Sequence, residues 1–156
     1  MQIIDVLKKY PAKETSLLEI LLEIDSLKDN HSISKEEMYV VANYVGVEVS
    51  HVYSVVSFYT LLSTEPRGKH IIQVCKDVPC YVNDAFDVRK TVERLLHISL
   101  GETTRDGLFT LEETACIGCC DEAPAMLVDL EPYTNLTKDK IHQIIDAYRG
   151  VKTSGA

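Results

Sequence analysis

The sequence has no apolar window long enough to cross a membrane, and its N-terminus, MQIIDVLKKYP, has no basic region followed by an apolar stretch. We therefore expect neither a membrane span nor a secretory signal, which favours a cytoplasmic protein. Basic side chains are also scarce, because the longest basic run is Lys8-Lys9 and the formal net charge is −8. Since this charge would repel phosphate groups, nucleic acid is not an expected partner.

Nucleotide-binding motifs are missing as well. Neither GxGxxG nor a Walker motif occurs, so the chain is not expected to bind a nucleotide itself. The composition is 46% hydrophobic and 26% charged, which is typical of a globular protein. A length of 156 residues fits one ordinary domain or two small ones.

Four of the five cysteines form two close pairs. Cys75 and Cys80 are separated by four residues in VCKDVPCYVND, and Cys116 and Cys120 by three in ETACIGCCDEAPAM. In a reducing compartment such thiols indicate a metal site rather than a disulfide framework. A [2Fe–2S] cluster needs two ligands on each iron, which suits two close pairs. Zinc also accepts such pairs, although the 35 residues between Cys80 and Cys116 are many for a zinc ribbon.

The fifth cysteine, Cys119, leaves other possibilities open. Cys116 and Cys119 have the C-x2-C spacing of many zinc sites and of thiol–disulfide oxidoreductases. No histidine lies within a cysteine pair, so a Rieske centre is not indicated. A zinc-stabilised adaptor and a thiol–disulfide oxidoreductase therefore remain alternatives to an iron–sulfur protein.

Residues 1–66 predict a bundle of three helices. The first ten residues fit a short amphipathic turn, with Ile3, Leu7 and Tyr10 on one side, or a loose arm, and we expect the loose arm. The first helix covers about 15–28, the second starts at a Ser34/Glu37 capping box and stops at Gly46, and the third starts near Ser50. The third helix is expected to direct these side chains inward: Val52, Val55, Val56, Tyr59 and Leu62. Phe58 is expected in the core as well. Because residues 1–66 hold ten acidic and five basic side chains, we expect a subunit-docking module, not a DNA reader.

A turn-rich link at residues 65–68 predicts a second domain over residues 67–156. The predicted elements are a strand at 70–74, a helix at 84–97, strands at 108–114 and 125–130, and a helix capped by Thr137. This order predicts a small α/β domain with both cysteine pairs at strand ends. Thr103 and Thr104 are expected to bond to loop backbone, although a position near the cysteines would let them tune a metal centre.

Several stretches resemble a known family: VSFYTLLSTEPRGKHIIQVC, the C-x4-C pair, GETTRDGLFTLEETACIGCC and DEAPAM. They are similar to the thioredoxin-like 2Fe–2S subunit of NADH:quinone oxidoreductase, which has relatives in NAD-linked and electron-bifurcating hydrogenases and in NAD-linked formate dehydrogenases. The resemblance covers residues 16–149, and the GETT-DG-FTL-C-x3-C run is its most specific part.

This resemblance implies a thioredoxin-like α/β domain after the N-terminal three-helix bundle. It implies one [2Fe–2S] cluster held by Cys75, Cys80, Cys116 and Cys120. The protein would be a non-catalytic electron-transfer subunit, with FMN and NADH bound by a partner flavoprotein and a hydrogenase or formate dehydrogenase subunit as a further partner. The chain departs from the family at Asp84, where the family often has glycine.

Overall fold

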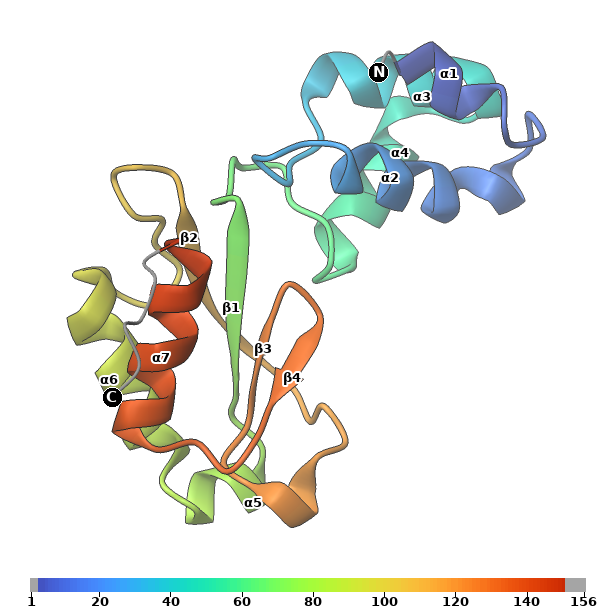
Figure 1. The fold of residues 1–156 in the computed structure, drawn as a ribbon. Coiled ribbons are helices and arrows are strands. Elements are labelled where there is room, and N and C mark those ends of the chain that lie inside the picture. Colours follow the sequence, from blue (N-terminus) through green and yellow to red (C-terminus); the bar gives the residue numbers. More distant parts are fainter. Residues whose placement is uncertain (1–2, 151–156) are drawn as a thin grey trace. The chain divides into compact units, whose positions relative to one another are not determined.

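The computed structural model describes residues 3–150, and the chain divides into two compact units, residues 1–67 and 68–156 (Figure 1). The boundary expected from the sequence, after residue 66, falls one residue earlier. No helix in the described range is both long and apolar enough to traverse a bilayer.

Over residues 3–67, the N-terminal unit contains one more helix than predicted. Its elements are α1 (Ile3–Leu7), the 3-10 turn η1 (Glu14–Ser16), α2 (Leu17–Ser26), α3 (Lys35–Val45) and α4 (Val49–Phe58). The expectation of a loose N-terminal arm is wrong, because Val6 and Leu7 of α1 are buried in the same core as the other helices. Apolar contact with that core orders a segment too short to be a stable helix alone.

The start of α3 confirms the predicted capping box. The Ser34 hydroxyl accepts a hydrogen bond from the Glu37 N–H, and the Glu37 carboxylate accepts one from the Ser34 N–H. Gly46 ends the helix at φ 78°, a left-handed conformation that glycine adopts without steric cost. Burial alone raises the pKa of Glu37, but the hydrogen bonds from Lys28 and Ser34 outweigh it, so the pKa is lowered. The carboxylate thus stabilises the folded unit in its charged form.

The outer end of α4 differs from the prediction. Val52, Val56 and Leu62 are buried as expected, whereas Phe58 is 77% exposed and Tyr59 40% exposed. The helix ends at Phe58, and Tyr59 has extended backbone angles, so the helical spacing that placed Tyr59 inside stops applying there. The two aromatic rings pack edge to face on the surface of this unit.

Arg67, the last residue of the N-terminal unit, is a buried charged residue. Arg67 is 8% exposed and Asp25 7%, with 3.6 Å between Arg67 Nη2 and Asp25 Oδ1. The guanidinium also donates hydrogen bonds to the carbonyl oxygens of His31 at 2.9 Å and Leu61 at 2.8 Å. Arg67 therefore ties three separate segments of the unit together.

The C-terminal unit has the predicted α/β organisation. Its strands are β1 (His70–Cys75), β2 (Phe109–Thr114), β3 (Met126–Val128) and β4 (Glu131–Tyr133), in the sheet order β2-β1-β3-β4. β1 is parallel to β2 and antiparallel to β3, and β4 is antiparallel to β3. The helices are α5 (Val78–Val82), α6 (Ala85–Leu96) and α7 (Lys138–Tyr148), with a 3-10 turn η2 (Cys120–Glu122).

Helices α6 and α7 lie side by side and cover one face of the sheet (Figure 1). Their apolar side chains, including Val92 and Ile145, pack with Ile72, Leu111 and Met126 of the strands. The predicted cap of α7 is confirmed, because the Thr137 hydroxyl accepts a hydrogen bond from the Lys140 N–H. This core stabilises the sheet, and the loops that follow β1 and β2 at one end of the strands are not part of it.

The sequence did not predict α5 or β4. α5 is five residues long and contains Pro79, and β4 is three residues long and contains Pro132. Segments this short carry no helical or alternating period, and proline disfavours a strand, whereas Pro79 lies in the first turn of α5, where proline is tolerated. Only the packing of the whole unit defines them.

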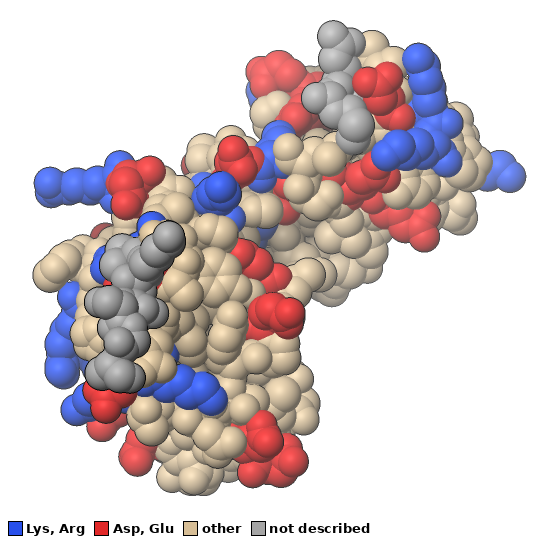
Figure 2. Space-filling view, viewed as in Figure 1, with Lys and Arg blue, Asp and Glu red and all other residues tan. Residues whose placement is uncertain are grey.

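Both signs of charge are spread over the N-terminal unit. On the face shown in Figure 2, acidic side chains lie beside and between the lysines.

Candidate functional site

The two cysteine loops begin at the same edge of the sheet. β1 ends at Cys75 and β2 at Thr114, and these residues are paired in the parallel register. Because parallel strands end at a common edge, residues 76–83 and 115–125 leave the sheet side by side. Two loops that are far apart in the sequence are brought together in this way.

The first thiol pair is buried. Cys75, the last residue of β1, is 1% exposed, and Cys80, within α5, is 2% exposed. They pack with Ala85 and Ala125 in a small apolar cluster. Burial raises the pKa of the Cys80 thiol, and a hydrogen bond with Cys75 raises it further.

The second thiol pair is exposed. Cys116 lies just after β2 and Cys120 begins η2, and their sulfur atoms are 3.2 Å apart. The hydrogen bond with Cys116 raises the pKa of the Cys120 thiol to about 11. Gly118, between them, has φ 85°, so the bend that brings the two sulfurs together uses a conformation that other residues rarely adopt.

Charges on the thiols of one pair affect the other pair. Cys116 contributes to the raised pKa of Cys80, and both Cys75 and Cys80 contribute to that of Cys120. The four sulfurs therefore lie within electrostatic range of one another. No group of three or more His, Cys, Asp or Glu side chains within residues 3–150 is arranged around a single metal ion.

The Cys119 sulfur is not part of the contact between Cys116 and Cys120. It lies 4.0 Å from the carbonyl oxygen of Ile117, a contact within its own loop. The C-x2-C spacing of Cys116 and Cys119 thus does not bring their sulfurs into the contact that Cys116 and Cys120 make.

The helix after the first pair begins at a strained residue. Asp84 is the N-cap of α6 with φ 65°, and its side chain makes no capping hydrogen bond. Aspartate is one of the few non-glycine residues that tolerate this left-handed conformation. The glycine that the resembled family often has here suits the same backbone geometry.

The GETTRDG run begins beside the middle of β2, where Gly101 and Glu102 bond to Leu111, and runs antiparallel to that strand toward the end opposite the cysteines. It precedes Phe109, which pairs with His70 at the start of β1. Thr104 bonds to the backbone of Phe109, which is the first residue of β2 and not part of the loop, and Thr103 bonds to the side chain of Thr110, so the prediction that both bond to loop backbone is wrong. Thr103 and Thr104 lie beside Thr110 and Phe109, four and five residues before the end of β2, so roughly 13–17 Å of strand separates them from the cysteine loop. These threonines therefore support the sheet.

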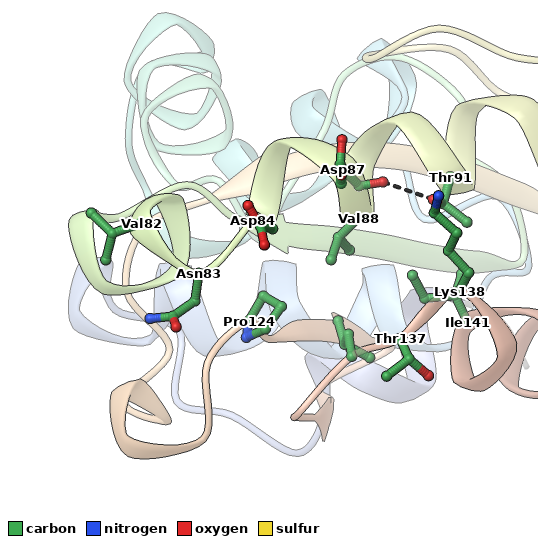
Figure 3. A pocket seen from close by; sticks show the side chains of 11 residues that line it. Val82, Asn83, Asp84, Asp87, Val88, Thr91, Pro124, Thr137, Lys138 and Ile141 are labelled. Carbon is green, nitrogen blue, oxygen red and sulfur yellow. Dashed lines mark hydrogen bonds between the residues drawn. The ribbon is translucent and has the colours of Figure 1, made fainter.

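A cavity of about 370 Å³ opens beside the cysteine loops, between the N-terminal ends of α6 and α7 (Figure 3). It is lined by Val82, Asn83, Asp84, Asp87, Val88, Thr91, Pro124, Leu136, Thr137, Lys138 and Ile141. The lining includes none of the cysteines, and its charges are of mixed sign. This arrangement does not define a ligand.

Three comparisons relate the chain to known proteins. A family model described as thioredoxin-like [2Fe-2S] ferredoxin matches residues 3–149. The chain is 34% identical over 146 residues to a subunit of the NADH-quinone oxidoreductase of Rickettsia felis, covering 92% of this chain and 87% of that one. It is also 34% identical over 112 residues to the corresponding subunit from Escherichia coli, covering 72% and 68% of the two chains.

A solved structure of NAD+-reducing [NiFe]-hydrogenase in the air-oxidized state has the same fold, with a TM-score of 0.74 at 20% identity. The match covers 86% of this chain but only 23% of the hydrogenase chain. The chain belongs to the thioredoxin-like [2Fe-2S] ferredoxin family. The predicted thioredoxin-like fold and the predicted [2Fe–2S] cofactor are thereby confirmed.

Proposed function

We propose that this protein is a single-electron carrier that holds one [2Fe–2S] cluster through Cys75, Cys80, Cys116 and Cys120. The observation that carries the proposal is the convergence of two thiol pairs at one sheet edge, with the Cys116 and Cys120 sulfurs 3.2 Å apart. Four thiols in two pairs are the donor set that two irons require. When bound, the cluster accepts and releases one electron at a time.

The two pairs have different tasks in this proposal. Cys75 and Cys80 lie in an apolar cluster that excludes water from one side of the centre. Cys116 and Cys120 lie at the surface, where an electron can enter or leave over a short distance. Burial and backbone hydrogen bonds around the sulfurs set the reduction potential.

The partner in this proposal is a flavin-containing protein that binds NADH. The names of the relatives support it, since they are subunits of NADH-quinone oxidoreductase, and NAD-linked hydrogenases and formate dehydrogenases are further candidates for the parent complex. Four large apolar side chains near Cys80 are more than half exposed: Val78, Tyr81, Val82 and Phe86. Such a patch is typical of a surface that a protein partner covers.

Metal analysis tests the cofactor assignment. After anaerobic reconstitution, the full chain should hold two irons and two acid-labile sulfides, with a reddish-brown colour and a paramagnetic signal on reduction. One zinc per chain without labile sulfide would instead support the adaptor. Two fast-reacting thiols without iron would support a thiol–disulfide oxidoreductase.

Co-purification with the flavoprotein tests the docking surface. Val78→Asp and Tyr81→Asp should weaken the complex while leaving the iron content unchanged, because both side chains are 69% exposed. Leu130→Asp is the matched control, since Leu130 is 71% exposed in the turn between β3 and β4, away from the cysteine loops. Equal retention of the complex by all three variants would contradict docking through α5. Phe58→Asp asks separately whether the helical unit docks as well.

A further inference from the structure

Asp77 makes an unusual contact between the two cysteine loops. It is the N-cap of α5, yet its side chain bonds to no N–H of that helix. Its Oδ2 instead accepts a hydrogen bond at 2.9 Å from the N–H of Cys116, 39 residues away in the sequence. An aspartate at this position ordinarily satisfies the N–H groups of its own first turn. Here the carboxylate accepts a hydrogen bond from the backbone of the other cysteine loop instead.

This contact matters because the start of the second loop has few other attachments. The end of that loop is held by backbone bonds from Asn135 to Glu122 and from Leu136 to Pro124. For residues 115–119, in contrast, the bond to Asp77 is the only hydrogen bond that reaches outside the loop in the described part of the chain. Ile117 and Cys119 add apolar contact with the buried cluster, but such contact does not fix an orientation.

We propose that Asp77 is a positioning residue for the second thiol pair. Asp77 lies between Cys75 and Cys80 in the sequence, so its position is tied to that of the first thiol pair. By holding the Cys116 backbone, it fixes the placement of the second pair relative to the first. This inference rests on the proposed role of these cysteines as ligands.

Three full-length variants separate the hydrogen bond from the charge. Asp77→Ala removes both, whereas Asp77→Asn keeps an acceptor oxygen and removes only the charge. Asp121→Asn is the control, because Asp121 is an exposed acid next to Cys120 that makes no cross-loop bond among the described residues. Asp77→Ala should lose iron to a chelator roughly ten- to a hundred-fold faster than the unmodified protein. Asp77→Asn and Asp121→Asn should stay within about threefold, with unchanged g-values in the reduced state.

A second readout needs no metal. In the apo protein, hydrogen exchange at the Cys116 amide should accelerate in Asp77→Ala and remain slow in Asp77→Asn, while circular dichroism shows both variants folded. If the chain holds no cluster at all, the proposed function fails but this exchange still tests Asp77. The inference would be overturned if Asp77→Ala changed neither the exchange rate at the Cys116 amide nor the rate of iron loss. Equal damage from Asp77→Asn would also overturn it, because the charge and not the bond would then be responsible.

Discussion

Replacing Arg67 by methionine is the most severe test of how the N-terminal unit is held together. The guanidinium is almost fully buried and contacts three segments, through the carboxylate of Asp25 and the carbonyl oxygens of His31 and Leu61. Methionine replaces the aliphatic stem of arginine and supplies neither a donor nor a charge. The substitution therefore keeps most of the packing of the stem while it removes the polar contacts.

The expected loss of stability comes from the polar groups that Arg67→Met leaves without their partner. Asp25 keeps its contact with His31 at 3.2 Å but loses the cation beside Oδ1, an atom that is buried and accepts no hydrogen bond in the described chain. Removing one partner of a buried ion pair costs about 3–5 kcal/mol. The carbonyl oxygens of His31 and Leu61 also lose their hydrogen bonds from Arg67. Their costs are not simply added to that of the ion pair, because bonds in one network are not independent. We expect the free energy of unfolding of this unit to fall by about 3–5 kcal/mol.

Urea unfolding followed by circular dichroism, with hydrogen exchange of the α2 and α4 amides to resolve this unit, measures the effect. The control is Lys9→Met in the same unit, which removes an ion pair with Glu23 in which Lys9 is 51% exposed, so its cost should stay below about 1 kcal/mol. In the double variant Asp25→Asn/Arg67→Met, no buried charge is stranded, so the two changes together should cost less than the sum of the single variants. A loss in Arg67→Met no larger than that of Lys9→Met would refute the reasoning.

Three further outcomes are expected. Cys119→Ala should retain iron and the reduced-state signal, whereas Cys120→Ala should lose most of the cluster; the reverse pattern in iron analysis would mean that the wrong thiol was assigned. Because the pKa of Glu37 is lowered on folding, its stabilising contribution is present above its unfolded pKa and disappears as pH falls through the folded value. Glu37→Gln should therefore flatten the decline of stability below about pH 4.5 in acid titrations followed by circular dichroism. Gly68→Ala should destabilise the C-terminal unit by about 1–3 kcal/mol in urea, since the added methyl would lie 2.7 Å from the Phe109 backbone; an unchanged midpoint would show that the strand start can shift.

Sequence alone determined the features that depend on near neighbours. The Ser34/Glu37 capping box, the glycine stop at Gly46 and the Thr137 cap are each decided within one or two helical turns, and all three are present. The candidate thiols were also visible from their spacing and from the resemblance. Local hydrogen bonds and local spacing carry this information, so no tertiary contact is needed to predict it.

Tertiary structure decided where these features lie relative to one another. The parallel register of β1 and β2 brings the two cysteine loops to the same end of the sheet, although they are far apart in the sequence. The same register brings Asp77 within 2.9 Å of the Cys116 N–H, a contact that no spacing rule predicts. Strand direction and pairing are properties of the assembled sheet, because each strand end is placed by contacts with residues far away in the chain.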